Sequence, residues 1–152
     1  MLRDQDRLLA LFEFGKEFGR LTLEGCDKFG AHVSDTRVSP RSDQVRSNYN
    51  IHVSIARTTP ACIAPIGQAW DLALARHPEL SLYATDGNHS SPAGAFLTAL
   101  VLLATITGAS PLDMPPLAES GVDEATQPLL RAVAADTVRD WPPRAWCPDD
   151  PY

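Results

Sequence analysis

The stretch from Pro92 to Thr107 constrains the fold most, because it contains no charged side chain. Ser91 in front of it is a good helix N-cap, and Pro92 is favoured as a first helical residue. Gly108 is a suitable residue to end such a helix. The run is too short to cross a bilayer and is rich in alanine, glycine and threonine, so it predicts a buried core helix and no membrane span.

The turn-forming sequence before this helix carries a carboxylate and an imidazole, Asp86 and His89. Their spacing lets a tight loop aim the carboxylate at one ring nitrogen and leave the other nitrogen free to act as a general base. The alternative is an aspartate that caps a turn beside an unrelated, solvent-facing histidine. Spacing alone does not separate the two readings, since such pairs arise often by chance.

A metal-dependent hydrolase with Asp86 and His89 as ligands is a third, weaker hypothesis. The other histidines, His32, His52 and His77, do not stand at ligand spacing to this pair. The sequence therefore predicts neither a metal nor another cofactor.

Apolar residues at helical spacing predict helices over 7–29, 44–58, 68–77 and 123–139, and short apolar runs predict strands over 31–38 and 61–66. In chain order these elements alternate as helix, strand, helix, strand and helix, which is typical of α/β proteins with a parallel sheet. Two strands make a poor sheet, because the exposed edge has no strand to pair with. We therefore expect further strands elsewhere, or a completing chain or second copy that pairs with this edge. We expect one α/β domain over 1–140 and an extended tail over 141–152, attached through Trp141 and Trp146.

Charge and cysteine content indicate which partners and which cellular compartment to expect. A net charge of −6 argues against nucleic acid and anionic membrane surfaces as partners. The cysteines, Cys26, Cys62 and Cys147, are odd in number and far apart, which predicts that all three are unpaired structural residues. The charged N-terminus is no signal peptide. The chain as written is expected to be cytoplasmic, and a secreted or periplasmic location stays open if its N-terminus is truncated.

Several linked segments together resemble the C-terminal part of the SGNH/GDSL hydrolases. They are Ala64-Pro65-Ile66-Gly67-Gln68-Ala69-Trp70, then Leu82-Tyr83, then Asp86-Gly87-Asn88-His89-Ser90-Ser91-Pro92-Ala93-Gly94, then Thr107-Gly108-Ala109-Ser110-Pro111. The resemblance is good over 61–111 and loose over 10–112. It implies a flavodoxin-like, three-layer α/β/α fold with a mostly parallel sheet, incomplete on its N-terminal side. It also implies hydrolysis of an ester substrate by a Ser-His-Asp triad, with His89 as general base and Asp86 as its orienting partner.

One part of the family pattern is missing. The nucleophilic serine of these hydrolases lies in a Gly-Asp-Ser block near the N-terminus, and this chain has no such block. No nucleophile and no oxyanion-hole donor can therefore be assigned. The leading hypothesis is the acid–base half of an esterase, which as an isolated chain should not react with a fluorophosphonate. The alternative is a non-catalytic α/β interaction module or an inactive fragment.

Overall fold

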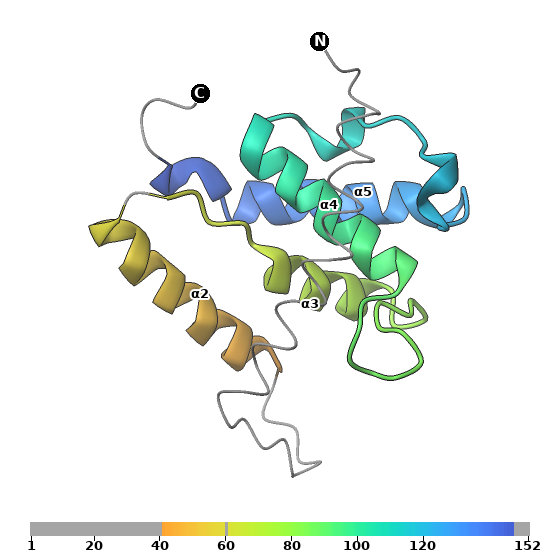
Figure 1. The fold of residues 1–152 in the computed structure, drawn as a ribbon, viewed down its shortest axis with the longest axis horizontal. Helices are drawn as coiled ribbons and strands as arrows, with labels where there is room; N and C mark the ends of the chain where they lie inside the picture. Colours follow the sequence, from red (N-terminus) through yellow and green to blue (C-terminus); the bar gives the residue numbers. More distant parts are fainter. Residues whose placement is uncertain (1–40, 60, 148–152) are drawn as a thin grey trace.

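The computed structural model describes residues 41–59 and 61–147. The α-helices of this part of the chain are α2 (Arg41–Thr58), α3 (Ile66–Arg76), α4 (Pro92–Thr107) and α5 (Thr126–Asp140). Its short 3-10 helices are η1 (Pro111–Asp113), η2 (Ala118–Ser120) and η3 (Pro143–Trp146). Figure 1 shows α3, α4 and α5 side by side, with α2 on one flank of this group.

The predicted core helix is confirmed as α4. The Ser91 hydroxyl accepts a hydrogen bond from the Gly94 amide, and Gly108 ends the helix in a left-handed conformation. Eleven of its 16 residues are buried, because α4 packs against both α3 and α5. The described part of the chain contains no helix that is both long and apolar enough to cross a membrane.

The predicted α/β/α fold is wrong for the residues that the structure describes. Their strand pairing is limited to one isolated antiparallel bridge between Tyr83 and Ser90, and no sheet forms. The helix predicted over 7–29 and the strand predicted over 31–38 lie outside the described residues. Without a sheet among the described residues, the expected sheet edge for a completing chain or second copy is absent there too.

The apolar run at 61–66 was predicted to be a strand because of its composition, but no described residue forms a strand beside it. Its backbone bonds instead to the chain after α5, through Ala61 N to Trp146 O (3.1 Å) and Ile63 N to Pro143 O (3.1 Å). Ile63 is buried, and α3 begins at Ile66. The apolar side chains thus pack among helices, where a buried strand would have packed them into a sheet.

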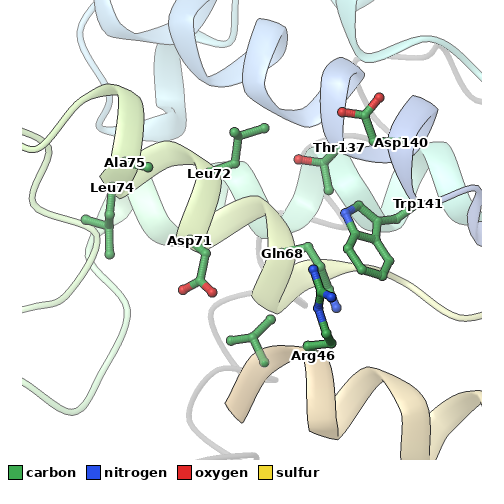
Figure 2. A pocket seen from close by; sticks show the side chains of 10 residues that line it. Arg46, Gln68, Asp71, Leu72, Leu74, Ala75, Thr137, Asp140 and Trp141 are labelled. Carbon is green, nitrogen blue, oxygen red and sulfur yellow. The ribbon is translucent and has the colours of Figure 1, made fainter. Parts of the chain in front are cut away.

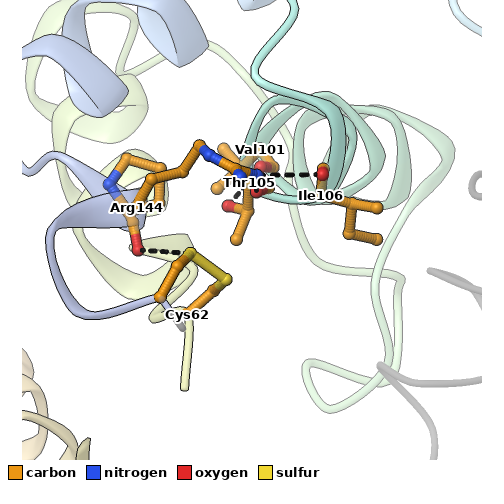
Figure 3. Close-up of a disulfide and its surroundings, with 7 residues drawn as sticks. Cys62, Val101, Thr105, Ile106 and Arg144 are labelled. Carbon is orange, nitrogen blue, oxygen red and sulfur yellow. Dashed lines mark hydrogen bonds between the residues drawn. A yellow bond between two sulfur atoms is a disulfide. The ribbon is translucent and has the colours of Figure 1, made fainter. Parts of the chain in front are cut away.

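The chain after α5 folds back onto the molecule. Figure 3 shows the disulfide that joins Cys62 to Cys147 across a sequence separation of 85 residues. The prediction of unpaired cysteines is therefore wrong for this pair, while Cys26 lies outside the described residues. The Arg144 side chain donates hydrogen bonds to the carbonyl oxygens of Thr105 and Ile106, at the end of α4.

Aromatic side chains attach α2 to the chain that follows α5. The rings of Tyr49 and Trp141 meet edge to face, with centroids 4.8 Å apart. The Arg57 guanidinium lies 5.4 Å from the centre of the Trp146 ring, within range of a cation–π contact. Both tryptophans therefore connect the C-terminal segment to the fold.

A candidate active-site loop

The loop between α3 and α4 closes on itself through its backbone. The Ala84 amide donates to the His89 carbonyl oxygen (2.8 Å), and the Gly87 amide donates to the Ala84 carbonyl oxygen (2.9 Å). Gly87 has a φ of 71°, a left-handed conformation that glycine adopts without strain. The result is a tight turn with Asp86 and His89 on opposite sides of Gly87.

The turn brings the two predicted site residues together. Oδ2 of Asp86 lies 2.5 Å from Nδ1 of His89. The other carboxylate oxygen accepts hydrogen bonds from the amides of Asn88 (2.9 Å) and His89 (3.0 Å). The carboxylate is therefore fixed by the backbone and faces one ring nitrogen.

These contacts favour the ionised form of Asp86. The hydrogen bond with the His89 side chain, followed by those from the backbone amides of His89 and Asn88, holds the pKa of Asp86 well below its usual range. A carboxylate that stays ionised can fix the ring tautomer and stabilise an imidazolium. The Asp86 carboxylate is thus in the charge state that an orienting partner needs.

The second ring nitrogen of His89 is open. Nε2 makes no hydrogen bond to any residue that the structure describes, and the side chain is 44% exposed. With Nδ1 next to Asp86, the neutral imidazole carries its free lone pair on Nε2, where a substrate or nucleophile can approach. The pair can therefore take a proton and give it back.

The serines next to His89 brace the loop. The Ser91 hydroxyl donates to the Ser81 carbonyl oxygen (2.5 Å) and accepts from the Gly94 amide (3.2 Å). The Ser91 amide also donates to the Leu82 carbonyl oxygen (2.9 Å). Ser91 therefore ties the loop to the first turn of α4, as its predicted capping role requires. No described serine forms a hydrogen bond with the His89 ring.

Trp70 of α3 contacts both the loop and α4. Its Nε1 donates to the Thr98 hydroxyl of α4 (3.1 Å), and its ring meets Tyr83 edge to face at 4.9 Å. A Cβ atom at Gly94 would overlap the Leu82 carbonyl oxygen and lie 2.8 Å from the Trp70 ring. Of the four segments on which the predicted resemblance rests, 64–70, 82–83 and 86–94 therefore meet around the start of α4, while 107–111 lies at its other end.

The remaining candidates for a metal site stay apart. Nδ1 of His77 faces Glu79 at 3.4 Å, and His52 lies on α2. The described residues contain no group of three or more His, Cys, Asp or Glu side chains arranged to hold a metal ion. His32 lies outside the described residues.

A separate cavity of about 560 Å³ lies between α2, α3 and α5, with Leu72 and Trp141 among the residues that line it (Figure 2). Arg46, Asp71 and Asp140 add charged groups to its walls. Neither Asp86 nor His89 lines this cavity. No local sequence pattern indicates this cavity, because its walls combine side chains from three separate helices.

Comparison of the chain with models of known protein families, with curated proteins and with solved structures finds no significant match.

Proposed function

We propose that Asp86 and His89 are the acid–base half of a Ser-His-Asp site that hydrolyses ester bonds. The observation that carries the proposal is the contact between Oδ2 of Asp86 and Nδ1 of His89, which leaves Nε2 open. The motif resemblance over 61–111, which includes Asp86 and His89, is its second support.

In this reaction a serine hydroxyl attacks the ester carbonyl carbon while Nε2 of His89 takes the hydroxyl proton. The same proton then passes to the departing alkoxide, and an acyl-serine remains. Water hydrolyses the acyl-serine by the same proton transfers in reverse order. Asp86 stabilises the imidazolium at each stage without taking the proton itself.

The serine comes, in this proposal, from a completing polypeptide, because the sequence has no Gly-Asp-Ser block. DNA flanking the gene would be translated and searched for a Gly-Asp-Ser block, and the encoded polypeptide would be expressed together with this chain. A fluorophosphonate probe reports the activated serine. We expect no labelling of this chain alone and stoichiometric labelling of the completing serine in the complex.

Point variants test whether His89 acts as the catalytic base. We expect His89→Ala to slow labelling by ~10²–10⁴-fold, the range that a positioned general base contributes, and Asp86→Asn to slow it strongly as well. His77→Ala is the matched control, because His77 also faces a carboxylate, that of Glu79, and it should label at the wild-type rate. Labelling that survives His89→Ala, or the absence of any completing serine, would contradict the proposal.

A further inference from the structure

Two side chains of the candidate loop take no part in holding it together. Asn88 is exposed and Ser90 is half-buried, and neither side chain makes a hydrogen bond to any residue that the structure describes. The turn is held by Asp86, by Ser91 and by backbone bonds. The Asn88 amide group and the Ser90 hydroxyl are therefore open to an outside partner.

The order of these residues has a chemical meaning. Asn88, His89 and Ser90 form an Asn-X-Ser triplet without proline in the middle. Such a triplet is the acceptor for N-linked glycosylation, which needs a hydroxyl two positions after the asparagine. Neither of the other asparagines, Asn48 and Asn50, is followed by serine or threonine at that distance. The sequence thus contains a single acceptor triplet.

The fold presents the triplet at the tip of a small hairpin. Tyr83 and Ser90 form an antiparallel bridge, and the Ala84 amide donates to the His89 carbonyl oxygen (2.8 Å). Asn88 lies in the turn between these paired stretches. Exposed tips of this kind are where enzymes that act on folded chains, such as proteases, gain access. The triplet therefore lies where a transferase can reach it.

The disulfide supports the compartment that this modification needs. N-linked sugars are added to secreted proteins, and disulfides persist in the oxidising compartments that such proteins enter. Cys62 and Cys147 form such a bond. This observation is independent of the triplet, because neither cysteine belongs to the loop.

We propose that Asn88 is an N-glycosylation site, and that its co-substrate is an oligosaccharide linked through pyrophosphate to a lipid carrier. Nδ2 of Asn88 attacks C1 of the first sugar and loses one proton to a base of the transferase. The bond between C1 and the pyrophosphate oxygen breaks, and its electron pair leaves with the pyrophosphate. The proposal does not rest on the acid–base role of Asp86 and His89. It bears on that role, because a glycan one residue before His89 would restrict access to Nε2.

The test uses the protein isolated from the cells that encode it, with its disulfide intact. Tandem mass spectrometry examines the peptide that contains Asn88. We expect a series of sugar masses on this peptide, and fragmentation that leaves the sugars attached should place them on Asn88.

Substitutions of Ser90 form a matched pair, because they leave Asn88 unchanged. Ser90→Ala removes the hydroxyl and should abolish the sugar masses, whereas Ser90→Thr keeps a hydroxyl and should retain them. Neither change removes a bond within the described fold, since Ser90 pairs with Tyr83 through its backbone. Circular dichroism checks that both variants fold.

Three results would overturn the proposal. Unmodified Asn88 in the isolated protein would show that the triplet is not used. Sugars that remain on Asn88 in Ser90→Ala would show that their attachment does not depend on the triplet. Sugars on a serine or threonine in place of Asn88 would indicate another class of transferase. The fluorophosphonate experiment enters none of these outcomes, so failure of one proposal is distinguished from failure of the other.

Discussion

At the scale of single residues, Gly94 determines how closely the candidate loop approaches α4. A Cβ atom there would meet the Leu82 carbonyl oxygen, which is backbone, and the Trp70 ring, which Thr98 and Tyr83 hold in place. We expect Gly94→Ala to lower the free energy of unfolding by about 1–3 kcal/mol, the usual cost of overpacking. Urea unfolding followed by circular dichroism measures this loss.

Gly67→Ala is the matched control for this change, because Gly67 is also helical. A Cβ atom at Gly67 would meet only the Val45 side chain, at 3.2 Å, which can move. Alanine is also the better helix former, by roughly 0.5–1 kcal/mol, so this variant should be about as stable as the wild type. Equal stability of the two variants would show that the close approach at Gly94 is not a constraint.

The titration of Asp86 reports directly on its contact with His89. The hydrogen bond with His89 is the largest cause that lowers the pKa of Asp86 from its usual 3.8. A carboxyl whose pKa is lower in the folded state stabilises the fold above the unfolded pKa, and this contribution is lost as the pH falls through the folded value. Acidification below roughly pH 4 should therefore loosen the loop.

We expect His89→Ala to raise the pKa of Asp86 toward 3.8. The pH dependence of the Asp86 carboxyl ¹³C shift measures it, and His77→Ala should leave the midpoint where it is in the wild type. The two backbone amides still bond to Asp86 in the variant, so part of the lowering should remain. An unchanged midpoint in His89→Ala would mean that the two side chains do not interact in solution.

At the scale of elements, helical periodicity correctly predicted the four α-helices α2 to α5 of the described residues, with small errors at their ends. The core helix was predicted to run from Pro92 to Thr107, which is α4, and the ranges 44–58 and 68–77 became α2 and α3 with shifted ends. The last helix starts at Thr126 and not at 123, and a turn precedes it in which the Asp123 carboxylate accepts hydrogen bonds from the amides of Ala125 and Thr126. Caps and periodicity are local signals, so a sequence carries them.

The fold class was predicted wrongly because it depends on tertiary contacts, which a local sequence pattern does not contain. A short apolar run such as 61–66 looks the same whether its neighbour is a strand or a helix. Only the tertiary structure reveals that its amides bond to Trp146 and Pro143. The Asp86–His89 pair was predictable for the opposite reason, since both residues lie in one turn.

The connector between α4 and α5 depends on one buried side chain. Gln127 is 1% exposed, and its amide group bonds to both backbone groups of Leu117, to the Val122 carbonyl and to the Ser120 hydroxyl. Arg131, one turn later, donates to the Met114 carbonyl. The connector thus has side-chain hydrogen bonds where a sheet or helix would have backbone ones.

We expect Gln127→Ala to lower the free energy of unfolding by more than about 2 kcal/mol, because each buried group left unpaired costs about 1–3 kcal/mol. Denaturant unfolding measures this change. Thr107→Ala is a milder comparison, since it removes only two local bonds of a partly buried hydroxyl, one to the Leu103 carbonyl oxygen and one from the Ala109 amide. A loss for Gln127→Ala no larger than that for Thr107→Ala would mean that water replaces the lost amide.

At the scale of the whole molecule, the disulfide joins the segment between α2 and α3 to the residue that follows η3. Cys62 precedes α3 and Cys147 follows η3, so the bond closes a loop that contains α3, α4 and α5. Neither cysteine count nor spacing could identify the pair, because three cysteines allow several pairings and proximity depends on the fold. Structural disulfides persist in oxidising compartments, which favours the secreted or periplasmic location that the sequence left open.

Loss of this bond should destabilise the molecule as a whole. For a sequence separation of 85 residues, the loss of loop-closure entropy corresponds to roughly 4.5 kcal/mol. The comparison is made in a Cys26→Ser background, so that no third thiol can exchange with the pair. We expect the chain with both Cys62→Ser and Cys147→Ser to unfold at a much lower urea concentration than its background, with a slope at least as steep because its denatured state is less compact. The background itself should react with a thiol reagent only after reduction, and immediate reaction of two thiols would show that the bond does not form. Equal midpoints for the two chains would mean that the contacts of Trp141, Trp146 and Arg144 hold the C-terminal segment without the disulfide.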